Sequence, residues 1–384
     1  MAETRQICTE FAKKTVILAF IAIIFVMPFT ALKARASGGS AYILIERSSG
    51  RILKSENPDL RLPMASTTKI MTAYTVLSEI EDIDSVITVA DEAVGVEGSS
   101  IYLRKGEKLS YRELLYGLML QSGNDSAVAL AIGVAGSVDA FADMMNGYAK
   151  RLGATDSHFV NPHGLHHPDH YTTARDLAVI TAAAYAMPEF KEIVSCKHTE
   201  ISSGEGKRYL ANKNKLLNIY DGANGVKTGY TKNAGKCLVS AAERGGMQLI
   251  AVVLNRGDMW AKSIELLNYG FDNYRMAKPV DKTAETYEIG VKGGEVGRVL
   301  IQPEENFVYP IRKDGSEKPD IRIEIPDRAL SAPVEYGQVV GKISVYAENR
   351  LLFSTNFTTI QNVEKKGVYD KVKDFFKAGD ESKT

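Results

Sequence analysis

Ser66-Thr67-Thr68-Lys69 places a hydroxyl three residues before an amine, at the expected start of a helix. Residues at positions i and i+3 lie on the same helix face, so Ser66 Oγ and Lys69 Nζ can meet without help from the rest of the fold. A serine hydroxyl is a weak nucleophile until a base takes its proton, and Lys69 is the base that this spacing offers. Burial or a second cation nearby would lower the pKa of Lys69 and keep its amine neutral.

A second motif, Ser122-Gly123-Asn124, is expected on a turn between two apolar helices. The first of these helices begins at a capping box, with Ser110 at the N-cap and Glu113 at N3. Ser122 could relay a proton to a leaving nitrogen, and the Asn124 amide could hold the lysine or a substrate carbonyl. The second motif therefore offers a proton path beside the first.

A third motif, Lys227-Thr228-Gly229, is expected on a strand. Lys227 could be the cation that lowers the pKa of Lys69, and Lys227 and Thr228 together suit a carboxylate. Gly229 removes a side chain beside a strand edge, so that a bound peptide could pair with the backbone. The three motifs in this order predict acyl transfer from a peptide with a free carboxylate end.

The composition excludes several classes of protein. The formal net charge is zero and 24% of the residues are charged, so we expect no nucleic-acid partner. We expect no metal site and no cofactor, because the histidines between His163 and His170 lie in a loop without a Cys or an acidic ligand pattern. Cys196 and Cys237 could pair outside the cytoplasm, but two buried free thiols are the simpler interpretation.

Residues 1–36 are predicted to be a secretory signal peptide. Basic residues precede an almost uncharged apolar run, which ends before the cleavage site Ala34-Arg35-Ala36. An uncleaved membrane anchor is the alternative. We therefore expect an extracytoplasmic protein, either at the outer face of the bacterial cytoplasmic membrane or secreted or periplasmic.

The order of elements predicts two domains after this leader. Residues 37–277 contain a hairpin, a helical block, a β meander and a last helix from Ala261 to Tyr269 that ends at Gly270. They form an α+β domain with an antiparallel sheet beside the helical block. Residues 278–362 contain short strands between Gly, Pro and Asp turns and predict a small all-β sandwich with a structural or docking role.

Residues 363–384 are predicted to form an amphipathic tail. Its apolar stripe is surrounded by lysines and consists of Val368, Val372, Phe375 and Phe376. A basic amphipathic helix of this kind can lie on an anionic membrane surface. A solvated tail and a helix packed on the β domain are equally good alternatives.

The three motifs in this order resemble those of the low-molecular-weight penicillin-binding proteins, specifically the serine D-alanyl-D-alanine carboxypeptidases. The resemblance covers essentially the whole mature chain, and Asn161-Pro162-His163-Gly164-Leu165 also resembles a stretch of this group. It implies a β-lactamase/transpeptidase-like catalytic domain in which Ser66 is acylated and Lys69 is the general base. The backbone N–H groups of Ser66 and Tyr230 would form the oxyanion hole.

The resemblance also implies the partners of the protein. The substrate would be a peptidoglycan stem peptide that ends in D-Ala-D-Ala, and β-lactam antibiotics would be covalent inhibitors. The β domain resembles one that is thought to hold the catalytic domain off the membrane, and the tail resembles the membrane anchor of this group.

One departure concerns the substrate carboxylate. Carboxypeptidases of this group often bind it with an arginine near the start of the last helix, and Arg256 is the only candidate here. Thr228 and Lys227 are the alternative contact for the carboxylate.

Three other functions share parts of this pattern. A β-lactamase would need a loop glutamate that positions water, and residues 161–171 contain no glutamate. A non-catalytic cell-wall scaffold would carry a lesion in one motif, and none is seen. A D,D-endopeptidase would share all three motifs and stays open.

Overall fold

The computed structural model describes residues 38–202 and 206–367. The predicted signal peptide, residues 1–36, lies outside the described residues. The same holds for residues 368–384, which carry the apolar stripe of the predicted tail.

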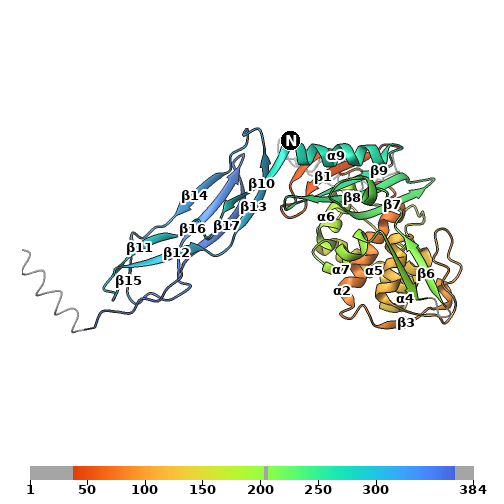
Figure 1. Cartoon of the computed structure of the whole chain (residues 1–384), viewed down its shortest axis with the longest axis horizontal. Helices are drawn as coiled ribbons and strands as arrows, with labels where there is room; N and C mark the ends of the chain where they lie inside the picture. Colours follow the sequence, from red (N-terminus) through yellow and green to blue (C-terminus); the bar gives the residue numbers. More distant parts are fainter. Residues whose placement is uncertain (1–37, 203–205, 368–384) are drawn as a thin grey trace, which may run out of the picture. The chain divides into compact units, whose positions relative to one another are not determined.

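An antiparallel sheet forms the centre of the first domain (Figure 1). Within the described ranges it has five strands in the order β2-β1-β9-β8-β7. The strands are β1 (Ala41–Glu46), β2 (Ile52–Glu56), β7 (Ala223–Thr231), β8 (Gly235–Arg244) and β9 (Met247–Leu254). Because β1 pairs with both β2 and β9, the predicted N-terminal hairpin and the predicted late meander share one sheet. Strand β7 lies at one edge.

The two faces of this sheet bury different sets of side chains. Successive residues of β1 alternate between them: Ile43 belongs to the core shared with the helical block, and Leu44 to the core beneath α9 (Met259–Asn273). The helical block contains α2 (Lys69–Glu79), α3 (Tyr111–Leu120), α4 (Asn124–Ala135), α5 (Val138–Arg151), α6 (Ala174–Ala184) and α7 (Pro188–Ser195). This arrangement confirms the predicted α+β domain.

Short elements complete the catalytic domain. They are η1 (Ala65–Thr68), β3 (Val86–Thr88), η2 (Asp91–Ala93), β4 (Lys108–Ser110), β5 (His198–Ser202), β6 (Lys207–Ala211) and α8 (Leu216–Ile219). Among the helices that the structure describes, no single one has the length and apolar composition needed to cross a membrane. Helices α4 and α5 meet that criterion only together, as a pair bent by 83°.

Local signals in the sequence account for several helix ends. The predicted capping box is confirmed: Glu113 N–H donates to Ser110 Oγ at 3.2 Å, and Ser110 N–H donates to Glu113 Oε2 at 2.9 Å. The predicted helix at Ser66 begins instead as the 3-10 turn η1, which continues into α2. In a 3-10 turn residues i and i+3 eclipse one another, so the spacing of Ser66 and Lys69 still brings them together.

The prediction that the last helix ends at Gly270 is wrong. Helix α9 continues through it to Asn273. A Cβ on Gly270 would stand 2.4 Å from Leu249 Cδ1 and 3.1 Å from Leu44 Cδ2. Gly270 is therefore present because the helix packs closely against the sheet there, and not because the chain turns.

The second domain is all-β, as predicted. Its strands are β10 (Tyr274–Val280), β11 (Tyr287–Lys292), β12 (Arg298–Pro303), β13 (Phe307–Arg312), β14 (Asp320–Glu324), β15 (Ala329–Ser331), β16 (Val339–Ala347) and β17 (Arg350–Thr359). In the part of the chain that is described, they form a sheet of order β14-β16-β17-β12-β11-β15 and a β10-β13 pair. Backbone pairing continues beyond β17, because Lys366 N–H donates to Gly293 O at 3.0 Å.

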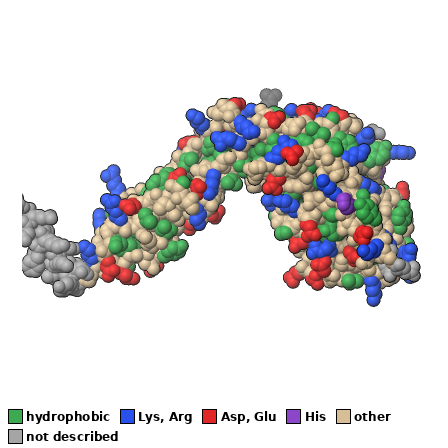
Figure 2. All heavy atoms as spheres, in the orientation of Figure 1, with side chains coloured by type: hydrophobic (Ala, Val, Ile, Leu, Met, Phe, Trp, Pro, Cys, Tyr) green, Lys and Arg blue, Asp and Glu red, His purple; other side chains and the backbone are tan. Residues whose placement is uncertain are grey.

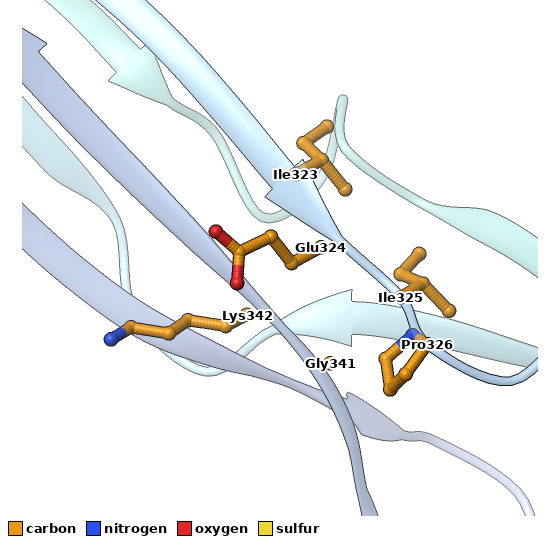
Figure 3. Close-up of a pocket in the computed structure, with 6 residues that line it drawn as sticks. All are labelled: Ile323, Glu324, Ile325, Pro326, Gly341 and Lys342. Atoms are coloured by element: carbon orange, nitrogen blue, oxygen red, sulfur yellow. The ribbon is translucent and has the colours of Figure 1, made fainter.

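A hollow in this domain lies between β14 and β16 (Figure 3). Glu324 and Lys342 are register partners on the two strands, and Figure 3 shows both extending to the same side. The other residues that line the hollow are Ile323, Ile325, Pro326 and Gly341. The hollow contains none of the predicted site residues.

We expect Gly270→Ala to lower the free energy of unfolding by about 1–3 kcal/mol, because the added methyl group overpacks the contact with Leu249. The matched control is Gly147→Ala in α5, where the nearest atom to a new Cβ is Arg151 Nη1 at 3.9 Å. The control should raise the free energy of unfolding by about 0.5–1 kcal/mol, because alanine favours a helix interior. Urea unfolding measures both, and a change of the same sign in the two variants would contradict the packing argument.

Candidate active site

Ser66 lies on η1, directly before α2, and its side chain is partly exposed. The preceding residue, Ala65, has a φ of +49°, which costs a non-glycine residue on the order of 1–2 kcal/mol. The Thr68 hydroxyl donates to Ala65 O at 2.8 Å. The backbone that enters Ser66 is therefore strained and held by its neighbours.

Lys69 is fully buried and has three polar contacts. Its Nζ lies 3.2 Å from Ser66 Oγ, 2.7 Å from Asn124 Oδ1 and 2.7 Å from His163 O. Burial, followed by the positive charges of Lys227 and Lys213, holds the pKa of Lys69 well below its usual range.

A neutral amine fits these three contacts. It has two hydrogens and one lone pair. The Asn124 and His163 oxygens can only accept, so they take the two hydrogens of Lys69. The lone pair is then left for the Ser66 hydroxyl, which is the arrangement that a general base requires.

Asn124 is oriented by the loop that precedes β4. Its backbone N–H donates to Ser99 O at 2.7 Å, and its Nδ2 donates to Glu97 O at 2.5 Å. Because the amide nitrogen is taken up in this way, Oδ1 must face Lys69. Ser122, two residues earlier, is buried with a φ of +64°, so the second motif forms a tight entry to α4.

The third motif lies on the edge strand β7. Gly229 lies against η1, because a Cβ there would stand 3.0 Å from both Ser66 N and Met64 O. Lys227 is buried, and its Nζ donates to Thr228 O at 3.0 Å. Burial first, and then the charge of Lys213, lower the pKa of Lys227 to about 7.

One side of β7 pairs with β8, and its other side is the sheet edge. Tyr230 is 66% exposed on this strand, immediately after the glycine that meets Ser66 N. Thr228 is partly exposed. The third motif therefore lies beside the serine at a sheet edge that can accept an extended peptide.

The structure does not bring Arg256 to this group. Its guanidinium pairs with Asp258, with Nε 3.0 Å from Oδ1, and lies 6.0 Å from the centre of the Tyr42 ring. Tyr42 belongs to the core beneath α9, on the opposite face of the sheet from the helical block. Trp260 is partly buried against the same core.

Two groups that shape the environment of Lys69 could not be identified from the sequence motifs: the Lys213 amine and the carbonyl of His163. Lys213 is a third cation, close enough to lower the pKa of both Lys69 and Lys227, and its Nζ donates to Ser99 Oγ at 3.2 Å. The only trace of it in the sequence is a lysine between two asparagines, Asn212 and Asn214. The carbonyl of His163 leaves no trace at all, because every residue has one.

Among the described residues, no group of three His, Cys, Asp or Glu side chains is placed to hold a metal ion. Burial lowers the pKa of both His163 and His170 to about 3, so these two rings are neutral. Cys196 and Cys237 are free thiols, of which Cys237 is buried and Cys196 partly exposed. The groups that meet at Lys69 Nζ are the Ser66 hydroxyl, the Asn124 amide and the His163 carbonyl.

Comparison with known proteins agrees with this chemistry. A family model described as D-alanyl-D-alanine carboxypeptidase matches residues 29–257. The chain belongs to the D-alanyl-D-alanine carboxypeptidase family. A second model, described as penicillin-binding protein 5, C-terminal domain, matches residues 274–365.

Known relatives match this chain over most of its length. The D-alanyl-D-alanine carboxypeptidase DacC of Escherichia coli is 33% identical over 361 residues, which cover 90% of this chain and 89% of the relative. DacF of Bacillus subtilis is 29% identical, and the match covers 85% of this chain and 86% of DacF. The crystal structure of penicillin binding protein 5 from Haemophilus influenzae matches this chain with a TM-score of 0.70 and 31% identity. The match covers 86% of this chain and 98% of that protein chain.

Membership of the family confirms the predicted fold class, the serine peptidase class and the carboxypeptidase activity. It also supports a peptidoglycan substrate that ends in D-Ala-D-Ala, and the binding of penicillins.

We expect Lys227→Gln to move the acidic limb of the penicillin acylation rate to higher pH. The charge of Lys227 is the largest contribution after burial to the low pKa of Lys69. Without that charge the pKa of Lys69 rises, and a smaller fraction of Lys69 is neutral at a given acidic pH. The effect should be present below about pH 7, where Lys227 is protonated, and should fade above it.

The measurement is the first-order acylation rate constant at saturating fluorescent penicillin, followed as a function of pH. Lys232→Gln, an exposed lysine in the turn between β7 and β8, is the matched control and should leave the profile in place. An unmoved acidic limb in the Lys227 variant would contradict the coupling of the two lysines.

Proposed function

We propose that Ser66 is the acylated nucleophile with which this carboxypeptidase removes the terminal D-alanine from peptidoglycan pentapeptide, and that penicillins acylate the same oxygen. The observation that carries the proposal is the position of Lys69 Nζ, 3.2 Å from Ser66 Oγ and 2.7 Å from each of two oxygen acceptors. A buried amine held in this way is a base aimed at one hydroxyl.

The reaction begins when Lys69 takes the proton of Ser66 and Ser66 Oγ attacks the carbonyl carbon of the penultimate D-alanine. The backbone N–H groups of Ser66 and Tyr230 stabilise the negative oxygen that forms. The proton then passes through Ser122 to the nitrogen of the terminal D-alanine, the peptide bond breaks, and D-alanine leaves. Water hydrolyses the ester on Ser66 and restores the free enzyme.

The contact of Gly229 with the Ser66 amide supports this oxyanion hole. It places the residue that precedes Tyr230 against the nitrogen of the nucleophile, so the two proposed donors come from adjacent backbones. The edge of β7 supports an extended substrate, which would add to the sheet beside the third motif.

The position of the protein in the cell is part of the same proposal. The basic start, apolar run and Ala-x-Ala site of residues 1–36 support export, and the substrate class lies outside the cytoplasm. Residues 37–277 would then be the catalytic domain and residues 278–362 the β domain that holds it off the membrane, with the first β-domain strand, β10 (Tyr274–Val280), crossing this boundary. The apolar stripe and the lysines of residues 363–384 support attachment to an anionic membrane surface.

Lys213 is the best candidate to bind the carboxylate of the terminal D-alanine. Arg256 is already paired with Asp258, and the pKa of Lys227 is about 7, so Lys227 loses its charge near neutral pH. Lys213 is exposed, and its charge reaches both active-site lysines. A free carboxylate that lies between Lys213 and Thr228 would meet one cation and one hydroxyl.

Mass spectrometry after incubation with a penicillin should show one covalent adduct, on a peptide that contains Ser66. Ser66→Ala should abolish the adduct and lower kcat for a D-Ala-D-Ala peptide by roughly 10³-fold or more. Ser78→Ala, at the far end of α2, is the control and should keep both. An adduct that survives in the Ser66 variant would refute the assignment.

Release of D-alanine from the peptide should be faster than cleavage of a cross-linked dimer, and the reverse order would favour an endopeptidase.

Lys213→Gln and Arg256→Gln together test the carboxylate contact. We expect the Lys213 variant to raise KM for the peptide roughly tenfold, the loss of one charge-assisted hydrogen bond, with a smaller change in kcat. The Arg256 variant should leave KM unchanged, because that guanidinium faces Asp258 and Tyr42. Steady-state kinetics measure both, and a rise of KM in the Arg256 variant alone would reverse the assignment.

A further inference from the structure

The loop from Val160 to Thr172 contacts one face of the segment that carries Ser66. The contacted positions are 65, 68, 69 and 72, which follow the i, i+3, i+4, i+7 spacing of a single helix face. The contacts are Gly164 against Ala65 O, the His170 ring with Thr68, His163 O with Lys69, and Pro162 O with Thr72. The mechanism above uses only the third of these.

The His170 contact has a defined direction. Val160 N–H donates to His170 Nδ1 at 3.1 Å, so the proton of the ring lies on Nε2. Burial lowers the pKa of His170 to about 3, and the ring stays neutral in that tautomer. Nε2 lies 2.8 Å from Thr68 Oγ1 and is therefore the donor to it.

The Thr68 hydroxyl continues the hydrogen-bond chain in the same donor-to-acceptor direction. Its hydroxyl has one proton, and with His170 Nε2–H as a donor to it, that proton goes to Ala65 O at 2.8 Å. The result is a continuous chain from Val160 N–H through His170 and Thr68 to Ala65 O. All of its side chains are buried.

Ala65 O is the point where this chain acts on the site. Ala65 has a φ of +49° and directly precedes Ser66, so the direction of its carbonyl fixes the path of the backbone into the nucleophile. Gly164 lies close to the same carbonyl and leaves no room for a side chain, because a Cβ there would stand 1.9 Å from Ala65 O. A strained conformation of this kind persists only where its surroundings hold it.

We propose that His170 is a positioning residue, which holds Ala65 O through the Thr68 hydroxyl and so keeps Ser66 Oγ within hydrogen-bond distance of Lys69, the base that takes its proton. The proposal rests on the role of Ser66 as nucleophile proposed above. It assigns to His170 no contact with the substrate.

The variants His170→Gln and His170→Asn test the contacts of the two ring nitrogens one at a time. Glutamine places its amide nitrogen near the position of Nε2 and keeps a donor for Thr68, whereas asparagine reaches only the position of Nδ1 and keeps the contact with Val160. Each variant loses one buried hydrogen bond, so a purely structural role predicts the same loss in both. We expect the acylation rate constant to fall roughly 10- to 100-fold in the asparagine variant, with KM unchanged, and to stay within about threefold in the glutamine variant.

Thr68→Val and Thr68→Ser test the same chain where a His170 variant fails to fold. The valine variant keeps the shape and loses the hydroxyl, so it should be as slow as His170→Asn, and the serine variant should be close to wild type. His170→Asn combined with Thr68→Val should be no slower than Thr68→Val alone, because both changes break one chain.

The outcomes separate the two proposals. Failure of Ser66 as nucleophile appears as a wild-type enzyme without a penicillin adduct on Ser66, and it overturns both. A wild type that is acylated, with equal rates in the glutamine and asparagine variants or additive losses in the double variant, overturns the role of His170 alone.

Discussion

The removal of the Lys69 amine from water is the constraint on which the site depends. A buried ammonium without a carboxylate partner costs several kcal/mol, so the fold must either neutralise it or satisfy its hydrogens. The structure does both: Asn124 Oδ1 and His163 O accept hydrogens, and Lys227 and Lys213 disfavour the charged form. Helix α2, the start of α4, the loop after Val160 and strand β7 meet around this one group. Residues of the three motifs therefore surround one buried amine, that of Lys69.

Ser66, the proposed nucleophile, is held by backbone contacts as much as by side chains. Gly229 on β7 lies against Ser66 N, and Gly164 on the loop lies against Ala65 O. Both contacts need a residue without Cβ, and together they enclose the 3-10 turn between a sheet edge and a loop. This enclosure explains how Ala65 keeps a left-handed conformation directly before Ser66. Charged side chains are spread over the surface that Figure 2 shows, whereas Lys69 and Lys227 are buried.

Predictions from the sequence succeeded where one segment decides the outcome. The capping box at Ser110 and Glu113 needs only four residues, and the N-terminal hairpin needs only two short strands and the turn between them. They failed where a distant segment decides. Gly270 reads as a helix end, yet it lies inside α9 because Leu249 and Leu44 lie beneath it.

The sequence by itself determined the residue types of the reaction and the one local distance among them, because Ser66 and Lys69 share a single helical turn. The family, the α+β domain and the β domain after it follow from motifs and patterns of the same kind. Only the tertiary structure decided the pKa of Lys69, the approach of Lys213 and the chain from His170 to Ala65. These depend on burial, on a backbone carbonyl brought from 94 positions away along the chain and on a histidine ring brought from 102 positions away. A carbonyl oxygen or a desolvated amine has no signature in a sequence, because its character comes from what the fold places around it.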